Sequence, residues 1–138
     1  KLVLERPELR PDVVEESLRL DPPVALLPRM CARDTSIGGV DIEAGTPLLF
    51  AIAAANRDPS VYPEPDRFDA RRPARRLLSF GHGVHFCLGS HLARREMEVG
   101  IGVLFERFPR LALAEPEGVF FSGAILRGPQ RLRSRMHP

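Results

Sequence analysis

Two stretches of the chain carry the 3.6-residue periodicity of an amphipathic helix. In residues 12–20, apolar side chains recur on one side and charged side chains on the other, and Pro22 ends the pattern. The stronger pattern covers residues 89–107, where Leu, Ala, Val and Met side chains fall near one stripe opposite a face of Arg and Glu. Because Pro109 ends this second pattern, we expect a short helix early in the chain and a longer one after residue 88.

Between these helices, short apolar runs separated by Gly and Pro predict strands and tight turns. Residues 33–37 and 40–42 flank a Gly-Gly pair, which is typical of a β-hairpin with a two-residue turn. Residues 52–56 suit a single helical turn. The remaining apolar runs predict further extended segments at residues 24–32, 47–51, 111–114, 119–121 and 131–135.

Residues 57–76 have no hydrophobic period and are rich in Pro and Arg. We expect a long ordered loop, called the meander below, which needs an anchor elsewhere in the molecule. The expected fold class is mainly α with small β-sheets (α+β). The pattern divides the chain into a helix with β-hairpins (1–56), the meander (57–76), a cysteine-containing loop (77–89), a second helix (90–108) and C-terminal strands and loops (109–138).

The composition is that of an ordinary globular domain and excludes several classes of partner. The 138 residues, 43% of them hydrophobic and 28% charged, are enough for one modest domain. A net charge of +2 is too small to indicate nucleic acid, and no apolar run is long enough to predict a membrane span. Two distant cysteines, Cys31 and Cys87, favour a reducing, cytoplasmic setting over a disulfide framework. Because Lys1 leads at once into charged, helix-like sequence, we expect a piece of a longer protein.

The glycine-rich loop around Cys87 carries the residues best suited to chemistry, and the long helix begins directly after it. Gly81 and Gly83 permit positive φ and a tight loop, and Gly89 lets a flat, bulky partner approach the backbone. The N–H groups of residues 88–90 would point back at the Cys87 sulfur and favour its thiolate form. A lone cysteine is more often buried and inert, but these surroundings favour a thiolate that binds a metal.

Two kinds of metal site fit this loop. His82, His85, His91 and Cys87 would supply four ligands for tetrahedral zinc, although their spacing differs from finger and ribbon patterns. Haem iron needs one axial thiolate, a Gly-rich loop close to a flat macrocycle, and basic groups for two propionates. Arg29, a single charge in an apolar strand, and His85 suit such anions, or else they are an edge-strand Arg and a loop-capping imidazole.

Charged residues of the first helix and the meander suggest a structural anchor. Glu16 and Arg19 are three residues apart and therefore face the same side of the helix. Arg67 in the meander is a candidate third charge. A buried Glu with two guanidinium groups can hold a loop that lacks secondary structure, provided that every donor is paired.

Together these residues resemble the cytochrome P450 family, the haem-thiolate monooxygenases, in its soluble bacterial type. The cysteine loop is similar over its full length to the haem-binding signature of the family, Phe80-Gly81-x-Gly83-x-His85-x-Cys87-x-Gly89. Other landmarks resemble the family in order and spacing, namely Glu16-x-x-Arg19, Asn56-Arg57-Asp58-Pro59, Pro65-Asp66-Arg67-Phe68 and Leu92-Ala93-Arg94-x-Glu96. The resemblance covers the whole chain but only the C-terminal third of a typical member.

The resemblance implies a haem b cofactor whose iron takes its axial thiolate from Cys87. It also implies that Arg29 and His85 bind the propionates. The other expected haem-binding residues are Phe80, Gly81, Gly83, Gly89 and Ala93. The expected structural triad that holds the cysteine loop is Glu16, Arg19 and Arg67.

The activity that the resemblance implies is insertion of one atom of dioxygen into a small organic substrate. Electrons would come from a ferredoxin-type donor with its reductase. The expected basic docking surface for an acidic donor comprises Arg71, Arg72, Arg75, Arg76, Arg94 and Arg95. The acid–alcohol pair of the distal helix is not among these residues, so no catalytic residue is expected in this portion. A non-catalytic haem-binding or protein-interaction module is the alternative.

Overall fold

A computed structural model of the chain describes residues 2–73 and 77–136. Helix α2 (Arg10–Leu20) matches the first expected helix but begins two residues earlier, with Pro11 in its first turn, where a missing N–H is tolerated. Helix α4 (Ser90–Arg107) matches the second. The short helix α1 (Leu2–Glu5) and the 3₁₀ turn η1 (Pro7–Leu9) were not predicted, since they are too brief to show a period.

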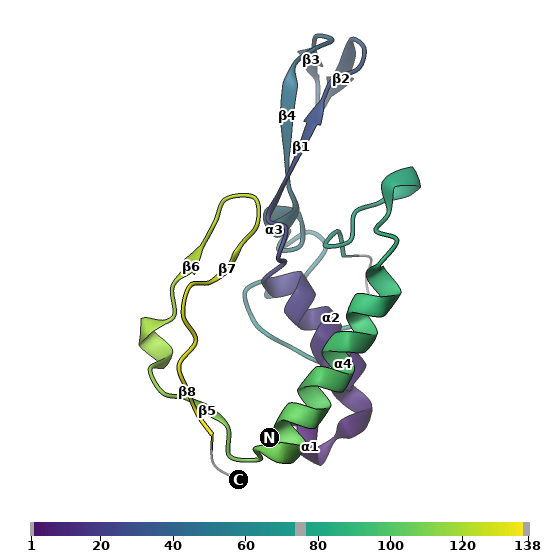
Figure 1. The fold of residues 1–138 in the computed structure, drawn as a ribbon. Helices are drawn as coiled ribbons and strands as arrows, with labels where there is room; N and C mark the ends of the chain where they lie inside the picture. Colours follow the sequence, from purple (N-terminus) through teal and green to yellow (C-terminus); the bar gives the residue numbers. More distant parts are fainter. Residues whose placement is uncertain (1, 74–76, 137–138) are drawn as a thin grey trace.

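The helices form one layer, at the bottom of Figure 1, in which α4 packs against both α1 and α2. A small apolar core lies between them. Val3 of α1, Val13 of α2 and Ala70 of the meander are buried, and Ile101 and Phe105 of α4 pack against them. The meander therefore contributes to the helical core although its own backbone is irregular.

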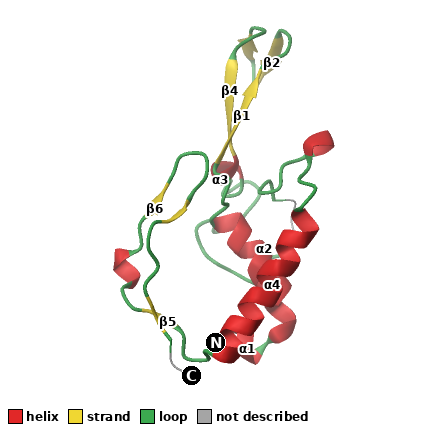
Figure 2. Ribbon diagram, in the orientation of Figure 1, coloured by secondary structure: helices red, strands yellow, loops and turns green. Residues whose placement is uncertain are grey.

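A twisted β-arm extends away from the helices (Figures 1 and 2). Strand β1 (Leu26–Met30) pairs antiparallel with β4 (Pro47–Ala51), and the tip is the pair β2 (Thr35–Ile37) and β3 (Val40–Ile42). Gly38 and Gly39 join β2 to β3 with φ of 58° and 80°. Positive φ at both turn residues is what a two-residue hairpin turn needs, which confirms the prediction from the Gly-Gly pair.

The helical turn α3 (Ile52–Ala55) ends the β-arm and leads into the meander. Residues 57–73 contain no helix or strand, and their path is closed by short turns such as Tyr62 N–H to the Asp58 carbonyl, 2.8 Å. The cysteine loop then passes through the 3₁₀ turn η2 (Gly83–His85) into α4.

The C-terminal residues form a second arm, seen at the left of Figure 1. It contains the 3₁₀ turn η3 (Pro116–Gly118), and its strands are β5 (Ala112–Leu113), β6 (Phe121–Ser122), β7 (Gly128–Pro129) and β8 (Ser134–Arg135). β5 pairs with β8, and β6 with β7.

The predicted strands were too long in five places. The segments expected at 24–32 and 33–37 are strands only at 26–30 and 35–37. Those at 111–114, 119–121 and 131–135 shrink to two residues each, while β7 was missed. The reason is that a run of apolar residues does not show where its hydrogen-bonded partner strand ends. Within the described part of the chain, every strand pair is a two-stranded sheet.

The surface of this chain is unusually apolar. Val84 and Leu88 of the cysteine loop are 97% and 100% exposed, and Phe120 and Leu126 of the C-terminal arm are each 72% exposed. Where such side chains form a contiguous patch, they mark a surface that contacts something else. Among the described residues, the helices are too short or too polar for a membrane-spanning segment.

Two glycines of α4 should respond differently to alanine. Gly100 meets open space, so Gly100→Ala is expected to raise the free energy of unfolding by about 0.5–1 kcal/mol through helix propensity. A Cβ at Gly102 would lie 2.5 Å from Nη1 of Arg10, which is paired with Glu106 at 2.8 Å. Gly102→Ala should therefore lose most of that gain, as urea unfolding can measure. An equal gain at both positions would show that Arg10 moves aside freely.

Candidate functional site

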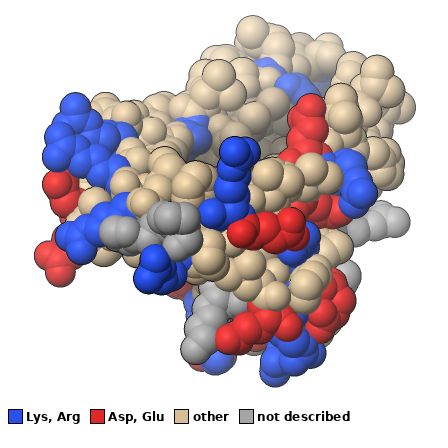
Figure 3. Space-filling view, turned by 60° about the horizontal axis from the view of Figure 1, so that its bottom comes forward, with Lys and Arg blue, Asp and Glu red and all other residues tan. Residues whose placement is uncertain are grey.

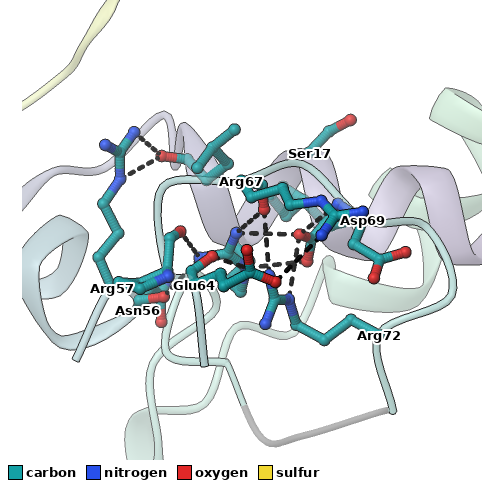
Figure 4. A network of polar contacts seen from close by, with 12 residues as sticks. Ser17, Asn56, Arg57, Glu64, Arg67, Asp69 and Arg72 are labelled. Carbon is teal, nitrogen blue, oxygen red and sulfur yellow. Dashed lines mark hydrogen bonds and ion pairs between the residues drawn. The ribbon is translucent and has the colours of Figure 1, made fainter. Parts of the chain in front are cut away.

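A network of polar contacts around a buried ion pair of α2 includes the meander residues Arg67, Asp69 and Arg72, which are labelled in Figure 4. Glu16 and Arg19 face the meander from α2 and are only 5% and 2% exposed. Arg19 donates from Nε and Nη2 to the two oxygens of Glu16, at 2.8 and 2.9 Å. This bidentate geometry is the strongest arrangement of a guanidinium on a carboxylate, and it compensates for loss of hydration.

Arg19 uses its other donors to hold the meander by its backbone. Nη1 donates to the carbonyls of Asn56 and Pro65 at 3.0 and 2.7 Å, and Nη2 donates to that of Arg67 at 3.2 Å. The Tyr62 ring lies 5.4 Å from the Arg19 guanidinium carbon. One side chain of α2 thus holds a loop that has no helix or strand hydrogen bonds of its own. This is the kind of anchor that we expected for the meander.

The third charge of the triad is Arg72, and the expectation of Arg67 was wrong. The Arg67 side chain is exposed and pairs with Glu64 at 3.0 Å, so only its carbonyl joins the network. Arg72 donates from Nε to Glu16 at 3.2 Å, and the Asp69 N–H donates to the same oxygen at 2.9 Å. The chain turns between residues 67 and 72, so the second of these arginines faces α2.

These contacts keep Glu16 ionised. Burial on its own would raise the pKa of Glu16, but hydrogen bonds from Arg19, the Asp69 N–H and Arg72, with the positive charge of Arg19, outweigh it. The pKa of Glu16 is therefore below its ordinary value of 4.5.

The cysteine loop is a compact turn that presents Cys87 to the exterior. The Cys87 N–H donates to the Phe80 carbonyl at 2.9 Å, which closes the loop at its base. Gly81 and Gly83 have φ of 77° and 74°, as the sequence predicted. The Ser90 N–H, expected to point at the sulfur, instead donates to the Cys87 carbonyl at 3.2 Å. A Cβ at Gly89 would lie 4.0 Å from the sulfur.

Arg94 connects the cysteine loop to both long helices. It projects from α4, forms an ion pair with Glu15 of α2, and places its guanidinium carbon 4.4 Å from the centre of the Phe80 ring. A guanidinium over an aromatic face is attracted by the ring quadrupole. Phe80 is therefore held on both its backbone and its side chain.

A cavity of about 1100 Å³ separates the β-arm from the cysteine loop. Most of its walls are apolar. The side of α2 and the β-arm contributes Leu18, Pro23, Val24, Leu27, Met30, Leu48, Phe50 and Ile52. The expected haem-binding residues that line it are Arg29, Phe80, Gly81, His85, Cys87 and Ala93. Gly83 and Gly89 are in the same loop but outside the lining.

The residues around this cavity suit a large, flat, mostly apolar group with a few anionic substituents. Cys87 offers one sulfur, and Arg29 and His85 are exposed side chains on opposite walls. Arg29 donates from Nη1 to the Pro28 carbonyl at 2.8 Å, which leaves other donors of its guanidinium for an anion.

The zinc alternative finds no support in the structure. Zinc would need His82, His85, Cys87 and His91 to converge, but across residues 2–73 and 77–136 no three His, Cys, Asp or Glu side chains gather in a way that could hold a metal ion.

The expected basic docking surface is only partly present. Arg72 and Arg94 are committed to Glu16 and Glu15, and Arg95 pairs with Glu98 at 3.2 Å. Arg71 is exposed, and Arg75 and Arg76 lie outside the described residues. Figure 3 shows basic and acidic side chains interspersed on the face that it presents.

Sequence reasoning missed Arg72, Asn56 and the contacts of Arg94. Arg72 follows Phe68-Asp69 closely, but it lies in an arginine-rich stretch in which several arginines were equivalent in sequence. Asn56 was noticed only as part of the Asn-Arg-Asp-Pro motif. Nothing in its neighbours indicated that its side chain reaches residues 78 and 79, where it bonds.

Glu16→Gln should change the pH dependence of stability. Since folding lowers the pKa of Glu16, its charge contributes stability that is fully present above pH 4.5 and is lost as the pH falls through the folded-state pKa. The variant should be less stable by about 3–5 kcal/mol at neutral pH, because Arg19 loses its carboxylate. The difference should shrink below pH 4.5 in urea unfolding series. A constant difference at all pH values would contradict this.

Two alanine variants distinguish the arginines of the meander. Arg72→Ala removes donors from Glu16 and from the carbonyls of Pro63, Glu64 and Arg67, and should lower the free energy of unfolding by about 1.5–3 kcal/mol. Arg67→Ala breaks an exposed pair and should cost about 0–1 kcal/mol. Chemical denaturation of both proteins measures the contrast. The reverse order would restore Arg67 to the triad.

Comparison with known proteins agrees with this geometry. The chain is 47% identical to the vitamin D(3) 25-hydroxylase of Pseudonocardia autotrophica, an alignment that covers 100% of this chain and 35% of that protein. It is 43% identical to the 6-deoxyerythronolide B hydroxylase of Saccharopolyspora erythraea, covering 98% and 34%. The chain thus spans about a third of the length of these relatives.

Solved structures give the same result. The tirandamycin C-bound P450 monooxygenase TamI superposes with a TM-score of 0.93 at 40% identity, over 98% of this chain and 35% of that one. P450BioI, solved with an acyl carrier protein that bears hexadec-9Z-enoic acid, gives 0.92 at 38% identity, over 98% and 35%. The family model described as Cytochrome P450 matches residues 6–130. The chain therefore belongs to the cytochrome P450 family.

Proposed function

We propose that this chain forms the thiolate-bearing half of a haem site in a monooxygenase that hydroxylates a small organic substrate. The observation that supports this most directly is the cavity of about 1100 Å³ with Cys87, Arg29 and His85 on its walls. An iron porphyrin has an apolar body, two carboxylates and one axial position for a sulfur, and these residues match each part. The named relatives that are hydroxylases favour hydroxylation over other oxidations.

In this proposal Cys87 holds the iron of haem b through its thiolate, and Arg29 and His85 bind the propionates. Phe80 covers the sulfur side of the loop, with its ring fixed by Arg94 and its carbonyl by the Cys87 N–H. Gly81, Gly83 and Gly89 keep the loop compact, and Ala93 lets α4 approach the macrocycle. When bound, haem iron with a thiolate ligand supplies the chemistry that splits dioxygen.

In this proposal the residues described here bind and orient the cofactor and supply the sulfur that ligates its iron. One oxygen atom would enter the substrate and the other would leave as water, with two electrons from a donor and two protons from solvent. A ferredoxin-type donor with its reductase remains our proposal for that partner. Its docking would rest on exposed arginines such as Arg71, since Arg72 and Arg94 are already paired.

The test is reconstitution of the full-length protein with haem, followed by reduction and carbon monoxide. The wild-type protein should give the Soret band characteristic of a thiolate ligand, and Cys87→Ala should lose it. Cys31→Ala is the matched control, because Cys31 is buried, donates to the Arg33 carbonyl at 3.0 Å and does not line the cavity. An unchanged band in Cys87→Ala, or no thiolate band in the wild-type protein, would refute the proposal.

A further inference from the structure

Asn56 is fully buried, at 0% exposure, and all of its polar groups are paired. Its backbone bonds to α3 and α2, since its N–H donates to the Ile52 carbonyl at 2.9 Å and its carbonyl accepts from Arg19 at 3.0 Å. Its side chain serves a distant segment. Oδ1 accepts from the Leu78 N–H at 2.8 Å, and Nδ2 donates to Oγ of Ser79 at 2.9 Å.

The segment that Asn56 holds is the base of the cysteine loop. Ser79 is fixed a second time, because its hydroxyl donates to the Leu18 carbonyl at the end of α2, at 2.6 Å. The Leu78 carbonyl accepts from the Gly81 N–H at 2.8 Å, and the Phe80 carbonyl accepts from the Cys87 N–H at 2.9 Å. The loop therefore closes on Leu78 and Phe80, and the Asn56 amide and α2 hold Leu78 and the intervening Ser79.

The chemistry of the position explains why an amide is used there. The side chain must accept one hydrogen bond and donate another in a buried site, and an amide does both at once through two separate atoms. An Asp would face Oγ of Ser79 with a second acceptor, while the Ser79 hydrogen is already given to Leu18. An Ala would leave the Leu78 N–H unpaired in the interior and would remove the donor to Ser79 Oγ, which is costly.

We propose that Asn56 is a positioning residue for the Cys87 thiolate. It acts through Leu78 and Ser79, which set the place of Phe80 and, across the Phe80–Cys87 hydrogen bond, the place of the sulfur at the cavity wall. The same residue accepts from Arg19, so it connects the Glu16–Arg19 pair to the cysteine loop. The part that concerns haem ligation rests on the function proposed above.

The experiment compares Asn56→Asp and the milder Ser79→Ala in the full-length protein. Val13→Ala is the matched control, because it destabilises the helical core with Val3 and Ala70 but does not contact the cysteine loop. The first readout is amide hydrogen exchange in the haem-free protein. In Asn56→Asp, exchange of the Leu78 and Cys87 amides should both accelerate by about tenfold or more relative to wild type and to Val13→Ala.

The second readout is the fraction of the carbon monoxide complex that keeps the thiolate Soret band after loading with haem. It should fall in Asn56→Asp, fall less in Ser79→Ala, and stay at the wild-type value in Val13→Ala. Faster exchange at Leu78 alone, with an unchanged Cys87 amide and an unchanged thiolate fraction, would overturn the proposal. A wild-type protein without the thiolate band would refute the proposed function instead, and the exchange of Cys87 would still decide whether Asn56 positions the loop.

Discussion

The fold depends on one buried ion pair that organises backbone which cannot organise itself. Glu16 and Arg19 would be costly in the interior if either stood alone. Together they are tolerable because each nitrogen of the Arg19 guanidinium and each oxygen of Glu16 has a hydrogen-bond partner. The meander has no ladder to hold it, so its carbonyls take the guanidinium of Arg19 as a substitute for neighbouring strands. Neither the buried ion pair nor the path of the meander could persist without the other.

A series of hydrogen bonds connects that ion pair to the cysteine loop. Arg19 binds the Asn56 carbonyl, the Asn56 amide binds Leu78 and Ser79, and the loop closes on Phe80 beside them. Arg94 adds a second route through its ion pair with Glu15 and its contact with the Phe80 ring. An exposed, glycine-rich loop is thereby held from inside the protein, which leaves its outer face free to meet a ligand.

Elements that depend on neighbouring residues were predicted correctly from the sequence. The prediction failed where several similar side chains could have made the same long-range contact. Helix periodicity located α2 and α4, and the Gly-Gly pair located the hairpin, because these patterns depend on neighbouring residues alone. The choice of Arg72 over Arg67 depends on how an irregular loop turns, and the reach of Asn56 spans 22 residues to Leu78. Strand ends failed for the same reason, since they are set by partners distant in the chain.

The way in which Arg19 holds the meander has a consequence for how this loop can vary. Its contacts are made to the carbonyls of residues 56, 65 and 67, and a carbonyl is present whatever side chain a residue carries. The loop is recognised by its path and not by its composition. Side chains that point to solvent, such as that of Arg67, can therefore be substituted at little cost. An insertion that shifts the backbone path by one residue would break the hydrogen bonds to Arg19.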